Sequence, residues 1–148
     1  MHSSQPPLSQ QQRLALDVAY QQTLYEIFVE SQVISLRVNC PNSALDNLLQ
    51  QYQHSCWAFV TAYNPYSQQL SVAENESNHA ALEAEVKRLE LLYFPAVGRD
   101  PAGAWPSEAS VFVMGVERER AIALGNEFSQ NAILYGTLSS PPHLIWLV

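Results

Sequence analysis

The stretch CWAFVTAYNPYSQQLSVAENESNHAALEAEVKRLELLYFPAV, residues 56–97, holds the clearest fold signal in the chain. It opens on an aromatic and β-branched run, 57–63, which predicts a strand that the following Asn-Pro pair ends. Ser71 and Glu74 have the spacing of a capping box, and apolar residues then recur at helical spacing. Residues 91–97 return to a strand pattern. The stretch therefore predicts a strand, a helix and a second strand.

Downstream residues extend this unit. A loop rich in turn residues covers 98–108, and a strand is predicted over 110–116. A helix over 117–128 and a strand over 132–138 follow, and the end of the chain, 144–148, has the pattern of a further short strand. In order, these elements give β-α-β-β-α-β with an extra C-terminal strand. That order is the ferredoxin-like, split βαβ plan of an α+β fold.

Upstream, the pattern is less regular. Residues 1–12 are polar and contain a Pro pair, so they predict a disordered lead-in. A broad apolar stripe predicts a helix over 13–30, the run 33–38 predicts a short strand, and a second capped helix is expected over 41–52. We therefore expect an N-terminal helical extension that covers one face or edge of the sheet.

The expected organisation is one α+β domain over residues 13–148. Its N-terminal extension covers 13–52, and the βαββαβ unit with the extra strand covers 56–148. Pro95 lies inside the second strand of that unit. Because proline cannot donate a backbone hydrogen bond, it favours an edge strand or a bulge there.

The charge of the chain limits its function classes. The 148 residues carry a formal net charge of −7, with only 7 basic residues, of which Lys87 is the single lysine. Nucleic acids and anionic membrane surfaces are bound by clustered Lys and Arg, so neither is an expected partner. No apolar run approaches the roughly 20 residues that span a bilayer. The expected class is a soluble, acidic protein.

The two cysteines, Cys40 and Cys56, have no metal-ligand spacing and favour free thiols in a reducing compartment. The start of the chain lacks the basic and apolar regions of a secretory signal. A cytoplasmic location is therefore expected. The chain also lacks a G-x-S-x-G elbow, a Walker loop and a G-x-G-x-x-G fingerprint, so we expect neither a cofactor nor a metal.

The predicted topology brings five separate pieces of the chain to one edge of the sheet. Right-handed crossovers place there the ends of the first two strands of the βαββαβ unit and the starts of the other two. Asn and Gln recognise ligands by donor–acceptor geometry, and free N–H groups at a helix start favour an anion or a carbonyl oxygen. The candidate binding residues at this edge are Thr61, Asn64, Asn75, Asn78, Arg99, Trp105, Glu108, Gln130 and Asn131.

Each candidate also has a purely structural interpretation. Asn64, before a proline, is typical of a turn, and Asn75 and Asn78 can satisfy backbone groups near the helix start. Trp105 can cover the core. Glu108 is a weak candidate for a general base, because a lone carboxylate near a strand start is usually solvated or paired. The convergence of the set favours a site more than any single member does.

Four spaced motifs carry a family resemblance. TAYNPYS at 61–67, ENESN at 74–78, VGRDPAGAWPSE at 97–108 and FSQNA at 128–132 resemble the bacterial domain-of-unknown-function family numbered 3293, over about residues 56–138. The resemblance implies no activity. It implies that the pattern residues are Thr61, Asn64, Asn75, Glu108, Gln130 and Asn131. Many relatives have Arg at the position of Asn78, and this chain departs from that pattern.

Three hypotheses for function follow. The first is a non-catalytic binding module whose amide-rich edge recognises a small molecule or a segment of a partner protein. The second is a small enzyme in which Glu108 is a general base and Asn75, with the helix start, stabilises an oxyanion. The third is an accessory subunit that docks on a larger assembly through the amphipathic segment 10–30. The absence of an activated nucleophile or a metal set favours the first.

Overall fold

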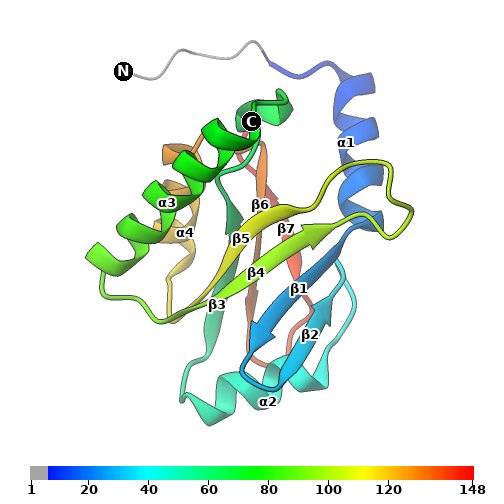
Figure 1. The fold of residues 1–148 in the computed structure, drawn as a ribbon. Helices are drawn as coiled ribbons and strands as arrows, with labels where there is room; N and C mark the ends of the chain where they lie inside the picture. Colours follow the sequence, from blue (N-terminus) through cyan, green and yellow to red (C-terminus); the bar gives the residue numbers. More distant parts are fainter. Residues whose placement is uncertain (1–6) are drawn as a thin grey trace.

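The computed structural model describes residues 7–148 as a mixed α and β fold on one strongly twisted sheet (Figure 1). Within those residues the strands are β1 (Leu24–Val29), β2 (Gln32–Leu36), β3 (Cys56–Thr61), β4 (Tyr93–Arg99), β5 (Glu108–Met114), β6 (Ala132–Thr137) and β7 (His143–Trp146). The helices are α1 (Gln10–Gln22), α2 (Ser43–Gln51), α3 (Val72–Arg88), α4 (Arg118–Glu127) and the 3₁₀ turn η1 (Pro65–Ser67). None of these helices is long and apolar enough to cross a membrane.

The sheet has seven strands in the order β2-β1-β4-β5-β3-β6-β7, and every neighbouring pair is antiparallel. The mixed α and β composition predicted from the sequence is confirmed. The ferredoxin-like plan is not confirmed, because the order of the seven-stranded sheet differs from it. The hairpin of β1 and β2 extends the sheet beyond β4. β2 confirms the strand predicted over 33–38, whereas β1 lies where the sequence predicted helix.

The helix predicted over 13–30 is wrong in its second half. α1 ends at Gln22, and the next residues form β1, in which Tyr25, Ile27 and Val29 are buried in alternation with more exposed neighbours. The apolar residues of this segment fit both a helical and an alternating period. Antiparallel pairing with β4 on one side and β2 on the other selects the strand.

The disordered lead-in predicted over residues 1–12 is wrong at its C-terminal end. Residues 1–6 lie outside the described residues, and Gln10 already belongs to α1. Ser9 is the N-cap of that helix: its Oγ accepts a hydrogen bond from the Gln12 backbone N–H at 3.1 Å, and its own N–H donates to Gln12 Oε1 at 2.9 Å. This reciprocal capping box begins the helix inside a Gln-rich segment.

Pro95 lies in an interior strand, not at the predicted sheet edge. β4 pairs with β5 along its length and with β1 over only part of it, where Ala96 is the first partner. Pro95 therefore lies just beyond the β1 ladder. The missing N–H of the proline costs no ladder hydrogen bond on that side.

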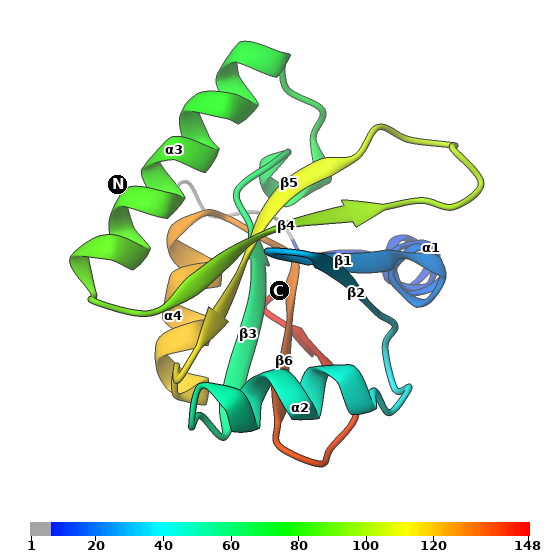
Figure 2. The ribbon, with the colours of Figure 1, turned by 60° about the horizontal axis from the view of Figure 1, so that its bottom comes forward.

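The two faces of the sheet have separate cores, because alternate residues of each strand point to opposite faces. On one face, Val60 and Val113 pack against Leu82 of α3 and Leu124 of α4. Figure 2 shows α3 and α4 on that side and α1 on the other. The second core lies on the face that α2 crosses, and α2 buries three leucines there, Leu45, Leu48 and Leu49. α1 covers the opposite end of this second face.

Candidate functional site

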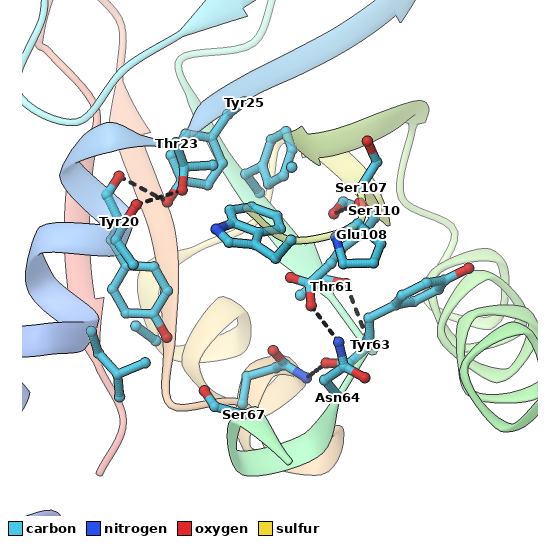
Figure 3. A pocket seen from close by; sticks show the side chains of 18 of the residues that line it. Tyr20, Thr23, Tyr25, Thr61, Tyr63, Asn64, Ser67, Ser107, Glu108 and Ser110 are labelled. Atoms are coloured by element: carbon cyan, nitrogen blue, oxygen red, sulfur yellow. Dashed lines mark hydrogen bonds between the residues drawn. The ribbon is translucent and has the colours of Figure 1, made fainter. Parts of the chain in front are cut away.

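A cavity of about 670 Å³ lies between α1 and the sheet, on the face that α2 covers at its other end. Its walls come from α1, the end of β3, the starts of β5 and β6, and the loop between β4 and β5. Figure 3 shows its polar side chains, which come from segments far apart in the sequence. Small-molecule sites in proteins are commonly concave and about 300–1,000 Å³ in volume. The cavity lies within that range.

The structure brings six of the nine candidate residues to this cavity. The six that line it are Thr61, Asn64, Asn75, Trp105, Glu108 and Gln130. Asn131 lies behind the wall, where its Nδ2 donates to Ser67 Oγ, a lining hydroxyl, at 2.7 Å. Asn78 and Arg99 do not line it. Arg99 instead pairs across the sheet with Glu26, at 3.0 Å between Nε and Oε1.

Asn64 and Asn75 form a reciprocal pair at the cavity wall. The Asn64 backbone N–H donates to Asn75 Oδ1 at 2.8 Å, and Asn75 Nδ2 donates to Asn64 Oδ1 at 2.9 Å. Asn64 has a left-handed backbone conformation with φ of 47°, which asparagine tolerates better than most residues. The same Oδ1 also accepts from the Leu70 N–H at 3.0 Å. The pair therefore fixes the turn after β3 against the first turn of α3.

Glu108, the first residue of β5, joins this network. Its Oε2 accepts a hydrogen bond of 2.7 Å from Asn64 Nδ2. Burial raises the pKa of the Glu108 carboxyl above its ordinary value of 4.5, and the hydrogen bond from Asn64 opposes that rise. Within residues 7–148 it forms no salt bridge. Glu108 is thus a half-buried carboxylate that faces a cavity, not the solvated or paired side chain of the structural interpretation.

Thr61 and Gln130 tie the strand ends together beneath the cavity. Thr61 Oγ1 donates to the Ala109 carbonyl at 2.8 Å, which links β3 to β5. Gln130 Nε2 donates to the Tyr63 carbonyl at 3.1 Å and to the Phe128 carbonyl at 3.2 Å. Gln130 is only 8% exposed, so these bonds satisfy a buried amide. Both residues therefore serve the architecture as well as the wall.

Sequence reasoning missed the opposite wall. Leu16, Ala19 and Tyr20 of α1 line the cavity, together with Tyr25 of β1. Burial raises the pKa of Tyr20 to about 12, with a smaller contribution from the charge of Glu108, so its hydroxyl stays protonated at neutral pH. The missed signal was the alternating burial pattern of residues 24–29, which is typical of a strand. Because β1 begins at Leu24, α1 ends at Gln22 and can pack over the sheet.

Comparison with known proteins gives one finding. The family model described as "Protein of unknown function (DUF3293)" matches residues 60–133, half of the chain. Comparisons with curated proteins and with solved structures give no significant match. The matched region contains all six candidate residues that line the cavity, whereas α1 lies outside it.

Proposed function

We propose that this chain, which belongs to the DUF3293 family, is a binding protein. It takes a small molecule into the cavity between α1 and the sheet. The observation that carries the proposal is the cavity itself, whose wall gathers six polar or aromatic candidates from four sequence-distant segments. Hydrogen bonds join Asn64, Asn75 and Glu108 to one another, and Thr61 and Gln130 are bonded to backbone carbonyls, so most of this wall is held in place before a ligand arrives. A preformed wall lowers the ordering cost of binding.

A cavity-filling variant tests this proposal. Ala19 lines the cavity from α1, whereas Ala15 lies exposed on the same helix. Trp is tolerated in helices, so Ala19→Trp fills the cavity mouth and Ala15→Trp is its matched control. We expect small molecules found by a thermal-shift library screen to bind the wild type and Ala15→Trp alike in calorimetry. Ala19→Trp should weaken them at least tenfold.

Hits that bind Ala19→Trp as well as the wild type would place the ligand site elsewhere and contradict the proposal. A cavity-directed library with no hit at all would do the same. The unfolding transition of both Trp variants, measured by circular dichroism, controls for a loss of folding.

A second candidate function is catalysis with Glu108 as general base. Its raised pKa and its place in a cavity favour this reading. The oxyanion-stabilising part has less support, because the Asn75 amide is already bonded to Asn64 and the start of α3 is capped by Ser71 and Glu74. Chemical analysis of an identified ligand after incubation with the protein separates the two functions. An unchanged ligand supports binding alone.

The docking alternative rests on the outer side of α1. Leu14 and Val18 are 61% and 54% exposed there. The inner side of the helix lines the cavity, so α1 covers part of its own chain. Replacing Leu14 and Val18 by Ser leaves the cavity wall unchanged. Such a variant should lose a docked partner but keep small-molecule binding.

A further inference from the structure

The cavity has a carboxylate and no positively charged side chain. Within residues 7–148, Glu108 is the only carboxylic acid that lines it, and no Lys, Arg or His does so. The nearest arginine in sequence, Arg99, is bonded to Glu26. A carboxylate that is half-buried without a cation is unfavourable, and a ligand that supplies the positive charge relieves that cost.

Three of the hydroxyl groups that line the cavity have already used their protons. Thr23 Oγ1 donates to the Ala19 carbonyl at 2.7 Å, Thr61 Oγ1 to the Ala109 carbonyl at 2.8 Å, and Ser110 Oγ to the Glu108 carbonyl at 3.0 Å. Each hydroxyl has one proton to donate, so these three groups can only accept hydrogen bonds from a ligand.

Three of the four amide side chains that line the cavity donate their hydrogen bonds within the protein as well. Gln130 Nε2 donates to two backbone carbonyls, and Asn75 Nδ2 and Asn64 Nδ2 donate to Asn64 Oδ1 and Glu108 Oε2. Of the carboxylate oxygens of Glu108, only Oε2 has a partner among the described residues. These committed groups and the free Oε1 of Glu108 present acceptors to the cavity, which a ligand with N–H donors complements.

The rest of the wall is apolar and aromatic. Tyr20, Tyr25, Phe59, Tyr63 and Trp105 all line the cavity. The faces of aromatic rings attract organic cations, and their area suits an apolar ligand body. The net charge of −7 on the whole chain also favours the approach of a cation.

We propose that the cavity binds a small organic ammonium ion, whose N–H groups donate to Glu108 and the acceptor hydroxyls while an apolar or aromatic body lies among the rings. This inference rests on the small-molecule binding proposed above and adds the chemical class of the ligand.

Three probes of one shape test it on the full chain at pH 7.5. They are 2-phenylethylamine, which is cationic, 2-phenylethanol, which is neutral, and 3-phenylpropanoate, which is anionic. We expect calorimetry or ligand-observed NMR to show the amine binding at least tenfold tighter than the alcohol, with the propanoate weakest. Glu108→Gln should remove this preference and leave the affinity for the alcohol within twofold. Glu76→Gln, an equal charge change on the exposed side of α3, should leave all three affinities unchanged.

Each other outcome overturns the ammonium proposal. A propanoate that binds as tightly as the amine contradicts it, and so does an amine affinity that Glu108→Gln leaves unchanged. If the alcohol binds in a manner that Ala19→Trp blocks but the amine has no advantage, this inference fails while the proposed function stands. If no probe binds at millimolar concentration, the inference fails and the library screen decides the proposed function. The comparison of three probes on the wild type holds even if Glu108→Gln does not fold.

Discussion

Two helices cover opposite ends of the same sheet face, and they do so in different ways. α2 inserts Leu45, Leu48 and Leu49 into the core, each no more than 2% exposed. α1 has no buried residue, and its inner side borders the cavity. Because α2 and the strands form the packed core, α1 does not need to fill the space beneath it, and a cavity remains there. One end of the face thus stabilises the fold, and the other is available for a ligand.

The largest loss of folding stability is expected from a substitution in α2. Leu48→Ala removes a fully buried side chain, and such truncations cost about 2–5 kcal/mol because a void remains. Leu16→Ala, on the cavity side of α1, should cost less than about 1 kcal/mol, because its side chain is only partly buried. Urea unfolding monitored by tryptophan fluorescence measures both. Equal losses would show that α1 is part of the packed core.

A second, smaller effect is expected in the polar wall. Asn75→Ala leaves the partly buried Asn64 N–H without its acceptor, which costs about 1–3 kcal/mol. Asn78→Ala, one turn further along α3, removes no hydrogen bond of the described network and should stay within about 0.5 kcal/mol. The free energy of unfolding in urea distinguishes them. A similar loss from both would mean that the first turn of α3, not the Asn64–Asn75 pair, stabilises the site.

The third expectation concerns pH. The folded-state pKa of Glu108 is raised, so its protonated form is favoured in the folded chain, and this contribution is lost as pH rises through the folded pKa. Glu108→Gln removes that loss and can still accept the hydrogen bond from Asn64. We therefore expect the variant to match the wild type in stability near pH 4 and to exceed it at pH 7. A variant less stable than the wild type at pH 7 would contradict the cost assigned to this carboxylate.

The smallest effect should appear at the rim of α1. The Arg13 guanidinium lies 4.4 Å from the ring centroid of Trp146, and its Nη1 donates to the Val148 carbonyl at 3.0 Å. Exposed contacts of this kind are worth about 0.5–1 kcal/mol. Arg13→Ala should speed amide hydrogen exchange in α1 several-fold and leave α2 unchanged, with Gln11→Ala as control. Unchanged exchange in α1 would show that the helix is held by other contacts.

Local signals in the sequence were the reliable ones. The Ser71–Glu74 capping box and the capped helix expected over 41–52, which is α2 with Asn42 as its cap, occur where they were predicted, because caps depend on neighbours within four residues. The strand over residues 24–29 was missed, because their apolar pattern fits a helix or a strand. Pairing with β4, about 70 residues away, decides between them. Long-range pairing was not visible in one sequence.

The same limit applies to the candidate site. Strand ends and loop positions placed Thr61, Asn64 and Glu108 near one another, and the structure brings them to one cavity. The ion pair of Arg99 was not foreseen, because its partner, Glu26, lies on the strand that had been predicted as helix. The wall formed by α1 could not be expected either. Because β1 was predicted as helix, the end of α1 at Gln22 was not recognised.

The walls of the cavity are divided between two parts of the chain, and this has a consequence for divergence. The acceptor side, from Thr61 to Gln130, lies within the matched segment 60–133, whereas Leu16, Tyr20 and Tyr25 lie before it. Chains that share only the matched segment would keep the acceptor side of the cavity and could carry a different second wall. On the proposed function, ligand selectivity would then change from one member to another through the N-terminal segment, while the acceptor chemistry stayed the same.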